Sequence, residues 1–276
     1  MPNLSEKNTP KLDEASNLIK NILAKKGGEK IICLTAYTFG MAKILDEFCD
    51  IILVGDSLGM TIYGLADTVD VSLEMMINHA KAVMRAAKKS LVVVDLPFGT
   101  YENSKEQALE SAKKVIESTG CHAIKIETSR DLVATTKFLV DHKIKVMAHV
   151  GLLPQSVRKI GGYKYQGRGQ KEAQEILETS KMLEQAGAFG IVIEAVPAIL
   201  ADEISAALKI PTIGIGASQN CDGQVLVIDD LLGLNQEFKP RFVKNYANLA
   251  NEIAIAVKNF CADVRAKKFP EKSNLI

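Results

Sequence analysis

The sequence predicts a single (β/α)8 barrel, or TIM barrel, with an additional helix before the first strand. Short runs of Val, Ile, Leu and Ala, typical of strands buried on both faces, alternate along the chain with longer amphipathic stretches. Eight such runs can be counted, which is the strand number of this barrel. Tryptophan is absent, so we expect a core built from Val, Ile, Leu and Ala. Branched aliphatic side chains of this kind usually fill the interior of a TIM barrel. The 276 residues fit one such domain, covering 1–276.

Composition and charge exclude several classes of protein. Hydrophobic residues make up 47% of the chain and charged residues 24%, which excludes disordered and fibrous classes. The net charge of +1 gives no electrostatic basis for binding nucleic acid. The five cysteines contain no C-x-x-C motif, so we expect reduced thiols rather than a zinc site. No signal peptide and no run of 18 apolar residues is found, which predicts a cytoplasmic protein without a membrane partner.

The first half of the chain shows the expected alternation. Residues 1–15 are predicted to form a loose arm, after which Ser16 would cap a helix that Gly27 and Gly28 end. Strands are then expected at 31–36, 51–54, 91–95 and 123–127, and helices at 39–48, 72–87, 104–118 and 129–140. Residues 57–71 lack clear periodicity, and loops of this length are often functional.

The second half continues the alternation with two irregularities. Strands are expected at 146–149, 191–194, 210–216 and 224–228, helices at 170–185, 197–208 and 242–264, and a frayed tail at 265–276. A glycine-rich loop at 151–169 carries Lys164 and Arg168. It would form a lid, bind an anionic ligand through these two residues, or be a solvated loop, and the solvated loop is favoured. Residues 217–223 are too short for a helix, so an open, doubly wound sheet is the alternative fold.

Five of the predicted strands end at or beside a residue able to ligate metal or move protons. These residues are Asp56, Asp95, Glu127, His149 and Glu194. The strand ends of a barrel lie on a circle at one face, so these side chains would surround a single cavity. Taken singly, each acid could equally be a helix cap or half of an ion pair, but four acids in register favour a site. His149 could equally be an interior histidine and is given no role.

The acids divide into two groups by position. Asp56, Asp95 and Glu127 come from successive strands and suit a hard divalent cation such as Mg²⁺, which prefers oxygen ligands. Lys125 lies two residues before Glu127, on the same strand face, where it could bind a substrate carboxylate. Glu194 stands apart from the other acids and is the candidate general base.

Five ordered blocks of sequence resemble one known family. They are VGDSLGM (54–60), DLPFGTY (95–101), GLLPQSV (151–157), GGYKYQGR (161–168) and CDGQVLV (221–227). They closely resemble the ketopantoate hydroxymethyltransferases, and the similarity extends from about residue 31 to residue 269. Five blocks in this order are a far more specific signal than any single short motif.

The resemblance implies a Mg²⁺-dependent (β/α)8 enzyme of pantothenate synthesis that is commonly a homodecamer. Members of this family transfer a hydroxymethyl group from 5,10-methylenetetrahydrofolate to 3-methyl-2-oxobutanoate, which gives 2-dehydropantoate. By position, the resemblance places the metal ligands at Asp56, Asp95 and Glu127, the keto-acid contacts at Asp56, Ser57, Asp95 and Lys125, and the base at Glu194.

The chemistry agrees with this resemblance. The C3 proton of the keto acid lies next to a ketone and is weakly acidic. A cation that chelates the keto and carboxylate oxygens would stabilise the enolate formed when Glu194 removes that proton. A free glutamate has a pKa of about 4.3, so burial of Glu194 would have to raise it.

The sequence departs from the family pattern at two places, and two other functions would also fit the same barrel. The chain has Thr128-Ser129 where the family usually has two glycines, and Ala217-Ser218 where Ala-Gly is common, which leaves the loop shapes open. The nearest rival is a metal-dependent 2-oxo-acid aldolase, lyase or mutase on the same barrel that uses no folate. The other is a catalytically silent barrel that serves binding or assembly, against which the retained Glu194 argues.

Overall fold

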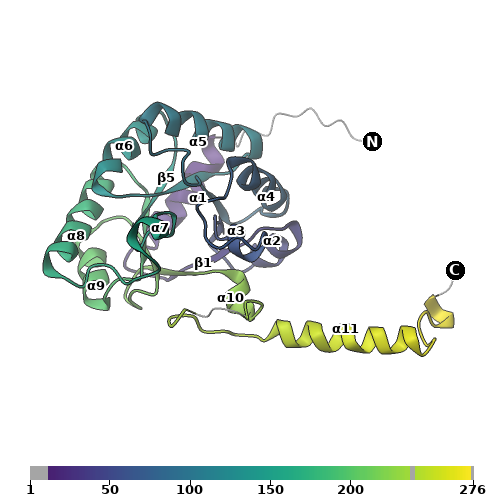
Figure 1. Cartoon of the computed structure of the whole chain (residues 1–276). Helices are drawn as coiled ribbons and strands as arrows, with labels where there is room; N and C mark the ends of the chain where they lie inside the picture. The colour runs from purple at the N-terminus through teal and green to yellow at the C-terminus, as the bar shows by residue number, and fades with distance from the viewer. Residues whose placement is uncertain (1–11, 237–239, 275–276) are drawn as a thin grey trace. The chain divides into compact units, whose positions relative to one another are not determined.

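All eight predicted strands are present and form a closed barrel (Figure 1). The computed structural model describes residues 12–236 and 240–274. The strands are β1 (Ile31–Thr35), β2 (Ile51–Val54), β3 (Leu91–Asp95), β4 (Ala123–Glu127), β5 (Val146–Gly151), β6 (Gly190–Glu194), β7 (Thr212–Ile215) and β8 (Gly223–Leu226). Each strand pairs in parallel with the next, and β8 pairs with β1. The predicted (β/α)8 barrel is confirmed, and the alternative of an open sheet is wrong.

Helices connect most of these strands. They are α1 (Leu12–Ala24), α2 (Phe39–Leu45), α3 (Leu58–Thr61), α4 (Leu73–Ala86), α5 (Lys105–Thr119), α6 (Val133–Asp141), α7 (Val157–Ile160), α8 (Gln170–Gln185), α9 (Ala198–Ala207), α10 (Ile228–Leu232) and α11 (Leu249–Arg265), with 3-10 turns η1 (Arg130–Leu132), η2 (Pro154–Ser156) and η3 (Lys272–Asn274). Ser72 and Ser104 cap α4 and α5 through their hydroxyl groups, as serines before an apolar periodic run are expected to do. Gly120 ends α5 in the left-handed conformation, with φ at 73°. Residues 216–222, all described, form no helix between β7 and β8, as predicted.

Several boundaries differ from those expected. Ser16 does not cap α1, because the helix already begins at Leu12; the rest of the predicted arm, residues 1–11, lies outside the described residues. Ser129 precedes a 3-10 turn and makes no capping hydrogen bond. Apolar periodicity located these helices, but it does not determine the residue at which the first turn begins.

Short helices inside irregular stretches were also missed. The segment 57–71 contains α3, and 151–169 contains η2 and α7, each only one turn long and therefore without a readable period. In the C-terminal part, α10 was not predicted, and α11 begins at Leu249 rather than near 242. In the predicted frayed tail, residues 272–274 form the turn η3, and 275–276 lie outside the described residues.

The helix α1 covers the end of the barrel at which the strands begin. Its buried Ile19 and Ile22 belong to one apolar cluster with Ile31, Ile51 and Leu91, the first residues of β1, β2 and β3. Farther along the strands, the same cluster fills the barrel interior with mostly aliphatic side chains. A second apolar cluster packs the outer faces of β5 and β6 against α8 and α9. Because α1 covers one end, the opposite end, where the strands finish, is the one available for a site.

Gly151, at the end of β5, should not tolerate a side chain. Its φ is +93°, and a Cβ atom there would collide with the backbone carbonyl oxygen of Glu194 and come within 2.8 Å of Val196 Cγ1. We expect Gly151→Ala to lower the free energy of unfolding by about 3 kcal/mol, from left-handed strain and overpacking together. Urea unfolding measures this loss. Gly40→Ala is the control, because a Cβ at Gly40 meets nothing within 4 Å; equal stability of the two variants would contradict the prediction.

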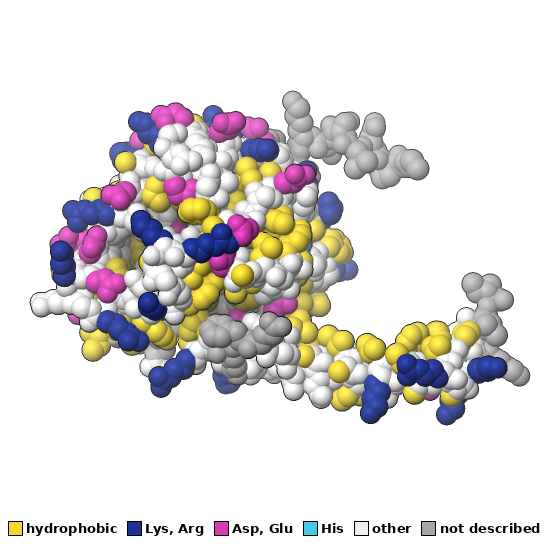
Figure 2. All heavy atoms as spheres, viewed as in Figure 1, with side chains coloured by type: hydrophobic (Ala, Val, Ile, Leu, Met, Phe, Trp, Pro, Cys, Tyr) yellow, Lys and Arg dark blue, Asp and Glu magenta, His cyan; other side chains and the backbone are white. Residues whose placement is uncertain are grey.

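The chain divides into two compact units, Met1–Val227 and Ile228–Ile276. The first holds the barrel, and the second holds α10, α11 and η3. Within the second unit, the backbone N–H of Tyr246 donates to the carbonyl oxygen of Leu231 at 2.8 Å. The helix α11 keeps its apolar side chains exposed, among them Ile253 and Phe260 (Figure 2). The expectation of one domain over 1–276 stays a prediction.

Charges of both signs are interspersed on the face of the barrel unit seen in Figure 2. This mixture agrees with the near-zero net charge of the sequence. Within residues 12–236 and 240–274, no helix has the length and apolar character needed to span a membrane.

Candidate active site

The strands bring the predicted acids together at the end of the barrel opposite α1. Asp95 and Glu127 are the last residues of β3 and β4, Glu194 is the last residue of β6, and Asp56 follows β2 by two positions. The backbone N–H of Asp56 donates to Oδ2 of Asp95 at 3.1 Å, which makes these two acids neighbours. All four acids lie at one end of the barrel interior, as the strand pattern predicts.

Lys125 is paired with Asp95 inside the barrel. Its Nζ lies 3.0 Å from Oδ1 of Asp95, and both side chains are less than a tenth exposed. Burial lowers the pKa of Lys125, but the nearby charges of Asp95 and Asp56 outweigh burial and raise it above its usual value. The ammonium group of Lys125 therefore stays positively charged beside Asp95 within the site.

The cluster carries more negative charge than Lys125 can balance. Burial raises the pKa of Asp56 to about 7, and the charge of Asp95 adds to the increase. Burial and the charge of Asp56 likewise raise the pKa of Glu127 well above its usual value. Three buried carboxyl groups facing one ammonium group form a set that a bound divalent cation would neutralise.

The donor set fits a cation by chemistry, although its side chains are partly engaged with one another. In the part of the chain that the structure describes, no three His, Cys, Asp or Glu side chains are grouped closely enough to hold a metal ion together. Asp95 contacts Lys125, and both oxygens of Glu127 accept from the backbone N–H of Gln155, at 3.0 Å and 3.1 Å. Bringing the carboxylates together around a cation therefore requires these contacts to change.

Ser57 follows Asp56 in the chain, and Tyr37 holds its hydroxyl group. Its Oγ lies 2.8 Å from the hydroxyl oxygen of Tyr37, so the two hydroxyl groups are hydrogen-bonded. It does not cap α3, which it precedes. A Cβ at Gly55 would lie 2.9 Å from Ser57 Oγ and 3.6 Å from Asp95 Oδ2, so only glycine leaves this space clear.

Glu194 faces His149 rather than the other acids. Oε2 of Glu194 lies 3.1 Å from Nε2 of His149, on the neighbouring strand β5. Burial raises the pKa of Glu194 to about 7, against a smaller lowering by the charge of Lys125. Burial, with the charge of Lys125, lowers the pKa of His149 well below its usual value, so its imidazole is neutral. A carboxyl group that titrates near neutrality beside a neutral imidazole suits a general base.

The backbone changes direction immediately after this glutamate. Ala195 has φ at +47°, which is unusual for a residue with a side chain, and it is buried. Its N–H donates to the carbonyl oxygen of Ile215 in β7 at 2.9 Å. Such strained residues cluster at functional sites.

Two loops join over this end of the barrel. Arg158 donates from Nε and Nη2 to the two oxygens of Asp67, at 2.8 Å and 2.9 Å, and also pairs with Asp70. The hydroxyl group of Tyr163 lies 3.5 Å from the sulfur of Met60. Burial raises the pKa of Tyr163 to about 12, helped by carboxylates that include Glu194. The segments 57–71 and 151–169 are therefore joined near the acids.

The threonine and serine that depart from the family pattern fit their surroundings. The Thr128 hydroxyl donates to the carbonyl oxygen of His149 at 2.9 Å, which ties the end of β4 to β5. Ser218 bonds Asp202, and its carbonyl oxygen accepts from Gln224 at 2.8 Å. Lys164 and Arg168 are both exposed on the glycine-rich loop, and the guanidinium group of Arg168 lies 5.5 Å from the ring of Tyr165. A ligand role for these two residues stays a prediction.

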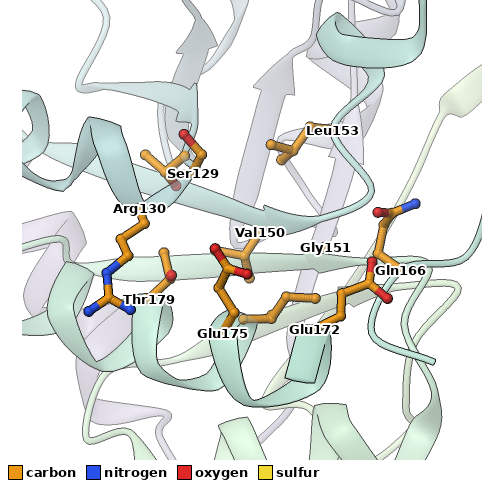
Figure 3. Close-up of a pocket in the computed structure, with 11 residues that line it drawn as sticks. Ser129, Arg130, Val150, Gly151, Leu153, Gln166, Glu172, Glu175 and Thr179 are labelled. Atoms are coloured by element: carbon orange, nitrogen blue, oxygen red, sulfur yellow. The ribbon is translucent and has the colours of Figure 1, made fainter. Parts of the chain in front are cut away.

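A pocket of about 170 Å³ lies between the ends of β4 and β5 and the helix α8 (Figure 3). Its lining residues are Thr128, Ser129, Arg130, Val150, Gly151, Leu153, Gln166, Glu172, Glu175, Ile176 and Thr179. None of the predicted site residues lines it. In Figure 3 the carboxylates of Glu172 and Glu175 reach into it from α8.

The residues that hold the acids in place were not predicted from the sequence. Gln155 and Tyr101 are buried among Asp56, Leu96 and Glu127, and Tyr37 holds Ser57. Gln155 and Tyr101 lie inside two of the blocks that carry the family resemblance, which was the available signal. Their contacts depend on the three-dimensional positions of loops, which periodicity does not reveal.

Comparison with known proteins identifies close relatives. A family model described as ketopantoate hydroxymethyltransferase matches residues 17–272. A protein of Paracoccus denitrificans (strain Pd 1222) named 3-methyl-2-oxobutanoate hydroxymethyltransferase is 52% identical over 250 residues, which is 91% of each chain. A protein of Rhizobium etli with the same name is 51% identical, over 90% of this chain and 91% of its own.

Solved structures of lower identity share the barrel. A crystal structure of 2,3-dimethylmalate lyase, a member of the PEP mutase/isocitrate lyase superfamily, has a TM-score of 0.61 at 14% identity and covers 94% of this chain and 86% of its own. Phosphonopyruvate hydrolase in complex with oxalate and Mg²⁺ has a TM-score of 0.59 at 14% identity and covers 94% of this chain and 91% of its own. At this identity the similarity establishes the fold alone.

Proposed function

Because the chain belongs to the ketopantoate hydroxymethyltransferase family, we infer that it is the enzyme that transfers a hydroxymethyl group to 3-methyl-2-oxobutanoate in pantothenate synthesis. The observation that carries this conclusion is the 52% identity over 91% of the chain. The activity predicted from the sequence is thereby confirmed. In the overall reaction, the C3–H of the keto acid is replaced by C3–CH2OH.

We propose that Asp56, Asp95 and Glu127 hold a Mg²⁺ ion. Support comes from the burial of all three carboxyl groups and from the raised pKa of Asp56 and Glu127. Bound there, Mg²⁺ would act as a Lewis acid toward the oxygens of the keto acid. The preference of Mg²⁺ for oxygen ligands agrees with this all-carboxylate set.

Lys125 and Ser57 are proposed to orient the keto acid. Lys125 pairs with Asp95 through one oxygen at 3.0 Å, and its ammonium group would donate to a substrate carboxylate in a buried place where charge-assisted hydrogen bonds are strong. The Ser57 hydroxyl, fixed by Tyr37, would donate to a substrate oxygen next to Asp56. These contacts would place C3 of the keto acid toward Glu194.

Glu194 is proposed to remove the C3 proton. Its pKa of about 7 makes it a far stronger base than an exposed glutamate, and Lys125 offers positive charge near the developing enolate oxygen. The Nε2 atom of the neutral His149, 3.1 Å away, would hold the carboxylate in place. The one-carbon unit would come from 5,10-methylenetetrahydrofolate and the hydroxyl oxygen from water. The homodecamer and the cytoplasmic location stay predictions.

Proton NMR of 3-methyl-2-oxobutanoate in deuterated buffer tests the first half of this scheme. The C3 proton signal should disappear only when both enzyme and Mg²⁺ are present, without any folate. Stoichiometric consumption of 5,10-methylenetetrahydrofolate then separates the transferase from a folate-independent lyase or mutase on the same barrel. Persistence of the C3 signal with enzyme and Mg²⁺ would defeat the proposed role of the site.

The rate of C3 proton exchange at saturating Mg²⁺ is expected to rise as the pH increases through about 7. Below this pH, Glu194 is protonated and cannot accept the proton, because burial raises its pKa to about 7. An exposed glutamate would titrate near about 4.3 and give a flat rate around neutrality. Initial exchange rates between about pH 5 and pH 9 measure this, after subtraction of the rate without enzyme. A rate independent of pH in this range would contradict the assignment.

A further inference from the structure

Gln155 connects two of the proposed metal ligands through both its backbone and its side chain. Its backbone N–H lies 3.0 Å and 3.1 Å from the two oxygens of Glu127. Its side-chain Nε2 donates to Oδ2 of Asp56 at 2.8 Å and to the carbonyl oxygen of Leu96 at 2.9 Å. One residue of the η2 turn, which Pro154 begins, therefore binds Asp56, which follows β2, and Glu127, which ends β4.

The orientation of the Gln155 amide is fixed by the chemistry of its partners. The hydroxyl group of Tyr101 accepts from the backbone N–H of Glu127 at 3.2 Å and donates its own proton to Oε1 of Gln155 at 2.5 Å. The Leu96 carbonyl can only accept, and so can Asp56 when it is ionised to bind a cation, so the NH2 group faces them. Gln155 is 5% exposed and Tyr101 1% exposed, which makes the network dry and rigid.

A neutral amide suits this position better than a charged donor. Gln155 supplies N–H groups to two carboxylates without adding positive charge, so the negative charge of the cluster remains available to a cation. An arginine or lysine there would satisfy the same oxygens and compete with the ion. Groups that hydrogen-bond metal-binding carboxylates typically set ligand orientation and metal affinity.

We propose that Gln155, oriented by Tyr101, is a positioning residue that holds Asp56 and Glu127 in the arrangement that binds the divalent cation. This inference rests on the metal site of the proposed function and adds to it the two residues that shape that site. Neither residue needs to touch the reacting atoms.

Binding of Mn²⁺ alone, followed by electron paramagnetic resonance without keto acid or folate, tests this proposal. Gln155→Met keeps the length of the side chain but removes its hydrogen bonds, and should raise the Kd for Mn²⁺ by about 10–100-fold. Tyr101→Phe removes one hydroxyl group and should raise the Kd by a smaller factor, about threefold to tenfold. The double variant should bind Mn²⁺ more tightly than the product of the two single effects predicts, because Tyr101 and Gln155 belong to one hydrogen-bond network. Gln174→Met is the matched control, since Gln174 is exposed on α8, where its Nε2 donates to Oε1 of Glu178 at 3.0 Å.

The outcomes separate this inference from the metal site itself. If the whole wild-type chain binds Mn²⁺ and both variants bind it within twofold of wild type, the positioning role is wrong, whatever the thermal stability of the variants. If wild type does not bind Mn²⁺, the metal site of the proposed function fails, and this inference fails with it. If Gln155→Met does not fold, Tyr101→Phe still decides, because unchanged Mn²⁺ affinity in that variant contradicts the proposed coupling.

Discussion

Glu194→Gln is expected to lower the rate of enzyme-catalysed C3 proton exchange by about 10²–10⁴-fold, the usual contribution of a positioned general base. The amide has the size of the carboxyl group but cannot accept the proton, so the keto acid should still bind with nearly unchanged affinity. Stability should stay the same or rise slightly, because a buried acid with a raised pKa is replaced by a neutral group. Proton NMR in deuterated buffer with Mg²⁺ measures the rate, and calorimetry measures keto-acid binding.

The control for this variant is Glu175→Gln. Glu175 is an exposed glutamate that lines the pocket beside α8, so its loss of charge should leave the exchange rate unchanged (Figure 3). An exchange rate for Glu194→Gln within threefold of wild type would show that another group removes the proton.

Lys125→Met is expected to lower the free energy of unfolding by about 3–5 kcal/mol, because it leaves buried carboxylates without their cation. Lys125 and Asp95 are 6% and 2% exposed, so water does little to relieve the loss. The loss should shrink as the pH falls, since protonation of Asp56 and Glu127, whose pKa is already raised, removes the uncompensated charge. Exchange of the C3 proton should fall by more than about 10²-fold, because the enolate loses its nearby cation.

Urea unfolding at several pH values, without added metal, measures the effect of Lys125→Met. Lys137→Met is the matched control: Lys137 pairs with Asp141 at 2.9 Å on the surface, with side chains 61% and 56% exposed. Such exposed pairs contribute about 0.5 kcal/mol or less. If the two variants lose similar stability, the buried pair does not have the role assigned to it.

Most of the barrel could be predicted because its strands are buried on both faces. The run ending at Asp95 is apolar at every earlier position, and such runs are short, continuous and bounded by turn residues. Amphipathic helices such as α4 also carry a clear period. One-turn helices such as α3 contain too few residues to show one, and the start of α1 depends on a cap that the sequence does not mark.

The candidate site could be predicted only in part. Acids at strand ends are visible in the sequence because strand order alone brings them to one face. The ion pair between Lys125 and Asp95 and the contact between His149 and Glu194 depend on strand register, which the sequence does not specify. The position of Gln155 depends on the path of the loop after β5. Its contact with Asp56, 99 positions earlier in the chain, therefore could not be predicted from the sequence.

The cover that α1 makes at one end of the barrel has a kinetic consequence. With that end filled by Ile19 and Ile22, reactants can enter and leave only through the opposite opening. Reactants and products of the proposed reaction would therefore share one opening, and each product molecule would have to leave the acid cluster before the next keto acid could reach it.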